Sequence, residues 1–189
     1  MVEGSGSSNG NRPWLRVIRG ELIENPRGRS NPPGKFTHLA NGVEPIVQGM
    51  IEAARETVGA RERIGNLCLI ALIRAEVGGD AVPMLREAAV VADSIMDRLL
   101  AAELMVQVAE GFWRAELDPW PVMDMAFRCA QEAPQCGGKE EVLAGVAYSY
   151  AVLGDYPRAE RIMDMLADFE LRKNLKAEID GLISSQAGE

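Results

Sequence analysis

The chain has 189 residues, and its 28 acidic side chains outnumber 20 basic ones to give a formal net charge of −8. Hydrophobic residues make up 47% of the sequence, which is enough for a buried core and excludes a chain that is disordered throughout. The longest apolar run, residues 67–73, is far shorter than the roughly 20 residues that a membrane span needs. The first ten residues have no secretory-signal pattern, so we expect a cytoplasmic protein with no membrane segment.

The first forty residues differ from the rest in charge and composition. They hold six basic and three acidic residues, whereas the remainder holds 14 basic and 25 acidic ones. Residues 4–11 are rich in Gly, Ser and Asn, and residues 25–34 contain three prolines and two glycines, which oppose regular structure. We therefore predict an irregular, partly disordered basic segment over residues 1–40 and a helical repeat domain over residues 41–189.

Between these two stretches, residues 12–23 carry apolar side chains that a purely solvated linker would not need. The candidate docking residues are Trp14, Leu15, Arg16, Val17 and Ile18. They form either a lid on the apolar run 67–73 or a docking motif for another protein. A third hypothesis is nucleic-acid contact through the arginines, but Arg12, Arg16 and Arg19 alone make a weak footprint, which disfavours nucleic acid as a partner.

Proline recurs at a nearly constant interval along the rest of the chain. Pro45, Pro83 and Pro121 are 38 residues apart, and Pro157 follows 36 residues later. Each proline opens an apolar segment with helical spacing. A period of about 20–50 residues is typical of stacked helical repeats, although an irregular helical bundle with accidental spacing is the alternative.

An aspartate precedes three of these prolines by two or three residues, namely Asp80, Asp118 and Asp155. A carboxylate there accepts bonds from the first free N–H groups of a helix, and proline is harmless in the first turn. Gly79 and Gly154 stand directly before two of the aspartates and suit the end of a preceding helix. These signals predict a turn followed by a helix start at each position.

Apolar residues recur in columns on both sides of each proline. After the proline the columns are Val47, Leu85, Met123 and Ala159; Ile51, Ala89, Phe127 and Met163; and Ala54, Ala92, Ala130 and Leu166. Before it they are Leu67, Met105 and Leu143; Ile70, Val108 and Val146; and Ala71, Ala109 and Ala147. These spacings give each helix one apolar face, and the alanine column allows paired helices to approach closely.

The repeat unit is therefore a helix, a short turn and a second helix. The predicted helices are residues 45–57, 61–77, 83–96, 98–115, 119–132, 139–153, 157–170 and 173–185. The last one, with Leu175, Ile179 and Leu182 inward and Lys173 and Lys176 outward, is expected to cap the array. Residues 67–73 are apolar on all sides, so we expect the N-terminal segment, a second copy or a ligand to cover that helix.

The final unit, residues 141–166, presents large apolar, small and aromatic residues, a Gly–Asp turn and a second small residue in that order. The positions are Leu143, Val146, Ala147, Tyr150, Gly154, Asp155, Tyr156 and Ala159. This unit resembles a tetratricopeptide repeat. The family period is 34 residues, shorter than the 36–38 found here, and Leu85 and Met123 replace the second small residue. The resemblance implies an all-α, right-handed α–α superhelix, a short solenoid of three to four helix–turn–helix repeats.

The resemblance also implies that the first helix of each hairpin lines a groove for an extended peptide or a partner helix. The candidate groove residues are Glu76, Glu103, Glu110, Trp113, Arg114, Glu141 and Tyr148. The alternative for the charged residues is an ordinary solvated surface. The alternative for Trp113 and Tyr148 is packing between repeats. Aromatic residues with polar edges are nevertheless enriched where proteins bind partners.

Motifs for chemistry are missing from the sequence. Three cysteines without CxxC spacing and a single histidine, His38, do not make a metal cluster or a nucleophile–base pair. Phosphate-binding loops, nucleophile elbows and zinc-protease motifs do not occur. We therefore expect no catalytic residue, no metal and no cofactor.

The sequence as a whole favours a noncatalytic interaction module, an adaptor or chaperone-like protein, whose partners are other proteins and include basic peptides. The alternative is a structural subunit that forms homo-oligomers through repeat faces and the N-terminal segment.

Overall fold

The computed structural model describes residues 40–135 and 137–187, and these residues form helices joined by turns. The helices are α2 (Ala40–Glu56), α3 (Ala60–Glu76), α4 (Val82–Asp93), α5 (Arg98–Arg114), α6 (Trp120–Glu132), α7 (Lys139–Val152), α8 (Tyr156–Met163) and α9 (Phe169–Ala187). The predicted all-α class is confirmed. The predicted irregular segment lies outside the described residues, except for Ala40, which begins α2.

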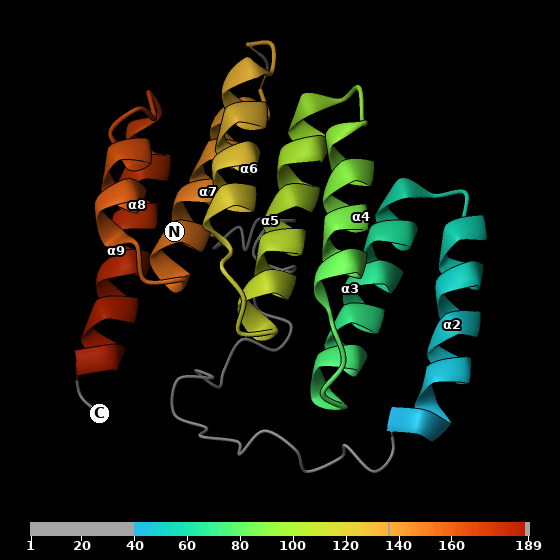
Figure 1. Ribbon diagram of the computed structural model, residues 1–189. Coiled ribbons are helices and arrows are strands. Elements are labelled where there is room, and N and C mark those ends of the chain that lie inside the picture. Colours follow the sequence, from blue (N-terminus) through green and yellow to red (C-terminus); the bar gives the residue numbers. More distant parts are fainter. Residues whose placement is uncertain (1–39, 136, 188–189) are drawn as a thin grey trace, which may run out of the picture.

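Consecutive helices pair into the hairpins α3–α4, α5–α6 and α7–α8, and the hairpins stack side by side (Figure 1). The first helices of the hairpins form one row with α9, which we call row A (α3, α5, α7 and α9). Row B consists of α2, α4, α6 and α8. Each helix of row A packs on the next one in its row, whereas neighbours within row B do not pack closely on each other. The right-handed superhelical twist stays a prediction.

The predicted aspartate caps are present at three helix starts. The Oδ1 atom of Asp80 accepts a hydrogen bond from the N–H of Val82 at 2.9 Å, and the Oδ1 atom of Asp118 accepts one from Trp120 at 3.0 Å. Asp80 and Asp118 lie one residue before the N-cap. Asp155 is itself the N-cap of α8, and its Oδ1 atom accepts a bond from the N–H of Arg158 at 3.1 Å. The prolines that follow lie in the first helical turn, where the missing donor costs nothing.

Four predicted boundaries are wrong by three residues or more. Helix α2 starts at Ala40, so Pro45 lies inside it rather than opening it. Helix α4 ends at Asp93, three residues early, because the next cap, Asp97, accepts bonds from two N–H groups of α5. Helix α8 ends at Met163 and α9 begins at Phe169.

Two hydrogen bonds stabilise the early start of α9. The Oδ1 atom of Asp168 accepts a bond from the N–H of Leu171 at 3.0 Å, and the N–H of Asp168 donates to Glu140 at 2.7 Å. These bonds satisfy donors at the helix start. The second one comes from α7, far away in sequence.

The predicted columns form the core. The alanine column is fully buried, and so are most of the large residues that surround it. Gly111 shows how tightly α5 approaches its neighbours, because a Cβ atom added there would lie 2.8 Å from Cδ2 of Leu85 and 3.6 Å from Sγ of Cys68. In α9, Leu175 and Ile179 are buried while Lys173 and Lys176 are exposed, as expected of a capping helix.

One column departs from this pattern. Ile51 and Met163 are buried as predicted, but the equivalent Ala89 and Phe127 are only partly buried. Ala89 and Phe127 lie on α4 and α6, the two inner helices of row B, whereas Ile51 and Met163 lie on α2 and α8.

The cover expected for the apolar run 67–73 is supplied largely by described helices. Leu67, Cys68, Ile70 and Ala71 are buried, and α3 packs on α2, α4 and α5. Leu69 remains 53% exposed. Helix α7 is more enclosed than α3, because Tyr148 is the only residue between Val142 and Ala151 that is not fully buried. None of the described helices combines the length and apolar character that crossing a bilayer requires.

Candidate functional site

The predicted groove residues lie on α3, α5 and α7, three neighbouring helices of row A. Because the repeat is 38 residues long, Glu76 corresponds to Arg114, Glu103 to Glu141 and Glu110 to Tyr148. Helices α3, α5 and α7 occupy equivalent places in successive hairpins (Figure 1). The two residues of each pair therefore lie at similar heights along the axes of two adjacent helices.

A hollow of about 230 Å³ lies between α3 and α5 on this face. Its lining residues are Gly65, Cys68, Leu69, Leu72, Gln107, Glu110, Gly111 and Arg114. The structure thus brings two predicted residues, Glu110 and Arg114, to the same place. It also adds Leu69, which sequence reasoning treated only as part of a covered apolar run.

Glu110 is the most enclosed acid of the predicted site, with 21% of its side chain exposed. Its carboxylate lies 3.7 Å from Nε of Arg114 one turn later. Burial raises the pKa of Glu110, and the nearby Arg114 only partly opposes this shift. The charged carboxylate is therefore poorly solvated, and a cation brought close to it would stabilise it.

The other three acids are more accessible. Glu103 accepts a hydrogen bond from Arg61 at 3.0 Å, which links α3 to α5 across the face. Glu76 is exposed at the end of α3, and Glu141 is exposed at the start of α7. Since these helices are in equivalent orientations, Glu76 and Glu141 lie at opposite ends of the face.

The two predicted aromatic anchors are partly buried. Trp113 and Tyr148 both pack against the hydrophobic core, and neither lines the hollow between α3 and α5. The hollow is therefore formed without them. The predicted docking residues Trp14, Leu15, Arg16, Val17 and Ile18 lie outside the described residues.

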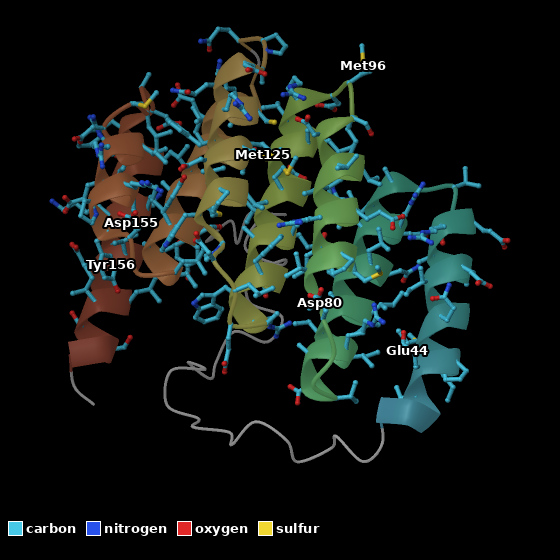
Figure 2. All side chains as sticks on the ribbon, viewed as in Figure 1. Glu44, Asp80, Met96, Met125, Asp155 and Tyr156 are labelled. Carbon is cyan, nitrogen blue, oxygen red and sulfur yellow. The ribbon has the colours of Figure 1, made fainter. Side chains whose placement is uncertain are left out.

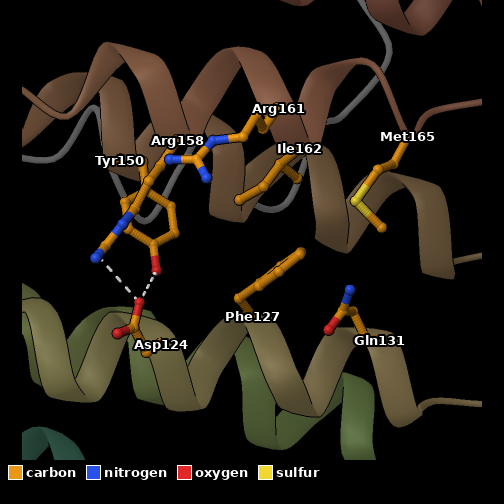
Figure 3. A pocket seen from close by; sticks show the side chains of 8 residues that line it. All are labelled: Asp124, Phe127, Gln131, Tyr150, Arg158, Arg161, Ile162 and Met165. Atoms are coloured by element: carbon orange, nitrogen blue, oxygen red, sulfur yellow. Dashed lines mark hydrogen bonds and ion pairs between the residues drawn. The ribbon is translucent and has the colours of Figure 1, made fainter.

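Row B carries a second hollow, of about 340 Å³, between α6 and α8 (Figure 3). Asp124 is its polar centre. The Tyr150 hydroxyl donates to Oδ1 of Asp124 at 2.8 Å, and Nη1 of Arg158 donates to the same oxygen at 3.1 Å. Arg158 also contacts Asp155, so one arginine joins α8 to α6.

Aromatic rings hold this bridge in place. The ring of Tyr150 lies parallel to that of Trp120, with 6.0 Å between the centroids, and the Arg158 guanidinium lies within 5.9 Å of both rings. Burial and the bond to Asp124 raise the pKa of Tyr150, so its hydroxyl stays protonated and keeps donating. Sequence reasoning assigned Tyr150 only to the aromatic position of the repeat. The signal for this bridge was the charge pair Asp124 and Arg158, 34 residues apart.

A third hollow, of about 590 Å³, lies in row B between α4 and α6. It is lined by Val82, Arg86, Ala89, Val90, Asp93, Phe112, Leu117, Asp118, Pro121, Val122 and Met125. Most of these side chains are apolar, and Val90 is 69% exposed. Sequence reasoning missed this groove because it placed the column containing Ala89 in the core.

Cys68 and Cys129 are poorly suited to nucleophilic chemistry. Burial raises the pKa of Cys68 to about 12, and the nearby Glu110 adds to the shift. Burial also raises the pKa of Cys129. Both therefore remain thiols at neutral pH. Across residues 40–135 and 137–187, no three His, Cys, Asp or Glu side chains are grouped closely enough to hold a metal ion.

Comparison with protein-family models, curated proteins and solved structures finds no match for this chain. The tetratricopeptide resemblance stays a prediction.

Proposed function

We propose that this chain is a noncatalytic protein-binding module of the cytoplasm that holds a segment of another protein along the row A face. The observation that carries this proposal is the hollow between α3 and α5, where the exposed Leu69 lies beside the half-buried pair Glu110 and Arg114. An apolar spot with charged groups around it is typical of surfaces that bind proteins.

The size of the hollow limits what enters it. A volume of about 230 Å³ is below the usual range of small-molecule pockets, about 300–1,000 Å³. One apolar side chain of a partner, packed against Leu69 and Leu72, fits better than a cofactor. The partner therefore contributes a single anchor at this point and makes its other contacts along the face.

The acidic residues of the row A face favour a basic partner. The predicted site holds four glutamates and one arginine, and Arg61 offsets one of the acids through its bond to Glu103. Glu110 is poorly solvated because burial raises its pKa. A lysine or arginine next to the apolar anchor would approach Glu110 and favour its charged form. The expected ligand is a basic peptide with an apolar residue.

A peptide library tests this proposal directly. Immobilised random 12-residue peptides, probed with the full chain, are expected to be enriched in sequences that place Lys or Arg beside Leu, Ile or Met. Leu69→Asp should weaken binding of the selected peptides at least tenfold, about 1.4 kcal/mol. Glu110→Gln should weaken it less and reduce its dependence on salt.

Two matched variants serve as controls. Ile46→Asp places the same charge at another exposed apolar position, 65% exposed on α2, and Glu160→Gln removes an exposed acid from α8. Both should bind the selected peptides as the wild type does. A library without enrichment, or selected peptides that bind Leu69→Asp as well as wild type, would rule out the row A face.

The ends of the array support a second candidate, an assembly subunit. Ile46 is exposed on α2 at one end, and Phe169 and Ile183 are exposed on α9 at the other. Two different apolar ends predict head-to-tail contacts rather than a two-fold dimer. Light scattering across protein concentration tests this candidate: a rising mass that Phe169→Asp abolishes supports it, and a constant monomer mass excludes it.

A further inference from the structure

The gaps between neighbouring helices of row B are not alike. Between α2 and α4, Arg55 and Glu87 form an ion pair at 2.7 Å. Between α6 and α8, the Asp124 bridge spans the gap (Figure 3). Between α4 and α6, no ion pair of described residues joins the two helices directly; at one end Arg98 of α5 contacts Asp93 and Glu132.

The gap between α4 and α6 is instead a continuous apolar groove. Its walls are Val82, Ala89 and Val90 on α4 and Pro121, Val122 and Met125 on α6, with Phe112 and Leu117 completing it. Figure 2 shows Met125 on the side of α6 that faces toward α4 and α5. The residues that occupy the position of Ala89 in α2 and α8 are Ile51 and Met163, and both are buried. The groove is thus a stretch of core-type surface without cover from the described helices.

The chain contains a segment whose chemistry matches this groove. At helical spacing, Trp14, Leu15, Ile18 and Leu22 fall on one side of residues 12–23, and Arg12, Arg16 and Arg19 fall on another. The groove offers apolar walls, and its charged lining residues are two acids, Asp93 and Asp118, and one base, Arg86. An apolar stripe flanked by basic residues is complementary to such a groove, in the manner of a helix that lies in a hydrophobic cleft.

The segment can reach the groove within the same molecule. Sixteen residues, 24–39, connect it to the start of α2 at Ala40, and a chain of that length spans at most about 55 Å when extended. Helix α4 is the next member of row B after α2 (Figure 1), and the groove lies between α4 and α6. Helices of this row stand further apart than the roughly 8–10 Å of directly packed helices. The extended connection is several times longer than that packed spacing, so it has length to spare for the wider step.

We propose that residues 14–22 of the same chain dock in the groove between α4 and α6, with Trp14, Ile18 and Leu22 against Val90, Phe112 and Met125. This intramolecular docking replaces the lid on residues 67–73, since α2, α4 and α5 already cover most of that run. It uses row B and leaves the row A face open, so it stands independently of the proposed peptide binding.

Limited trypsin digestion of the intact chain tests the docking. Arg16 and Arg19 are cleavable positions inside the segment, whereas Arg27 and Arg29 lie in the connection and serve as an internal reference. Mass spectrometry should show cleavage after Arg16 and Arg19 about tenfold slower than after Arg27 and Arg29. Val90→Glu should remove this difference, because it places a charge on the groove wall. A tenfold effect corresponds to about 1.4 kcal/mol of docking free energy.

Controls separate docking from loss of folding. Val58→Glu adds the same charge at another exposed valine, 101% exposed against 69% for Val90, and should keep Arg16 and Arg19 protected. Ile18→Glu changes only the segment and should lose protection as Val90→Glu does.

Three outcomes would overturn the proposal. Equal cleavage at all four arginines in the wild type would show that the segment is not docked. Protection that increases with protein concentration would assign the groove to the segment of a neighbouring copy. Protection that survives Val90→Glu and is lost in Leu69→Asp would place the segment on α3 instead.

Discussion

Row A and row B are built from the same repeat but hold together in different ways. The helices of row A pack directly on one another, and their shared alanine column, Ala71, Ala109 and Ala147, is fully buried. The helices of row B stand further apart and are connected by side chains, namely Arg55 to Glu87 and Arg158 to Asp124. Small residues bring helices together, while long charged residues span the spaces that remain.

This difference decides where each row can bind a partner. Among the described residues, row A offers the hollow of about 230 Å³ between α3 and α5. Row B offers two larger hollows in its gaps, one polar and bridged and one apolar and open. Changes that add or remove bulk should therefore act mainly in row A, and changes that remove polar contacts should act mainly in row B.

The largest expected effect comes from bulk in row A. Ala109 is fully buried in α5, so Ala109→Leu adds three carbon atoms where no space exists and should lower the free energy of unfolding by about 3 kcal/mol. Ala89→Leu makes the same change at the open groove of row B and should change it by no more than about 1 kcal/mol. Urea unfolding of both variants measures the difference. Equal losses would show that the two rows are packed to the same density.

A smaller effect is expected when the bridge between α6 and α8 loses one bond. Tyr150→Phe removes the hydroxyl that donates to Asp124 but keeps the ring stacked on Trp120. The free energy of unfolding should fall by about 1 kcal/mol. The loss stays modest because Arg158 still donates to the same carboxylate oxygen.

A double-mutant cycle separates this bond from other consequences of the substitution. If Tyr150→Phe and Asp124→Ala act through one contact, the double variant should be more stable than the sum of the two single losses predicts. Strict additivity of the two losses would mean that the bond does not stabilise the fold.

The sequence predicted the elements whose cause is local. Asp80, Asp118 and Asp155 each sit next to the N–H groups that they cap, so a short stretch of sequence contained the whole signal. The apolar columns likewise report which helix face is buried. The boundary between α8 and α9 was missed because it depends on Glu140, which comes from another helix.

The binding surfaces were harder to predict for the same reason. The prediction grouped Glu110 and Arg114 from the spacing along one helix, and both line the same hollow. It could not predict that Leu69 of α3 would complete that hollow, or that Ala89 would be left without a covering neighbour. Both facts depend on the distance between helices, which a repeat length does not specify.

The smallest expected effect is also the most specific, since it concerns two glutamates with opposite pKa shifts. In row B, the bond from Arg55, helped by Arg63, lowers the pKa of Glu87. In row A, burial raises the pKa of Glu110. Glu87 therefore adds stability above the unfolded-state pKa of about 4.3, and that stability is lost as the pH falls through its folded value. For Glu110 the folded state favours the neutral acid, so stability is lost as the pH rises from about 4.3 through its folded pKa.

Replacement of each glutamate by glutamine should reveal these opposite signs. Glu87→Gln should be less stable than wild type at pH 7, on the order of 0.5 kcal/mol, with the difference shrinking toward pH 3. Glu110→Gln should be at least as stable as wild type at pH 7 and should lose its advantage below about pH 4. Urea unfolding at intervals from pH 3 to pH 7 measures both curves. The two substitutions are chemically identical, so any difference between the curves comes from the surroundings of each glutamate. If both substitutions changed the free energy of unfolding in the same direction at pH 7, the contrast between a buried acid in row A and a paired acid in row B would be wrong.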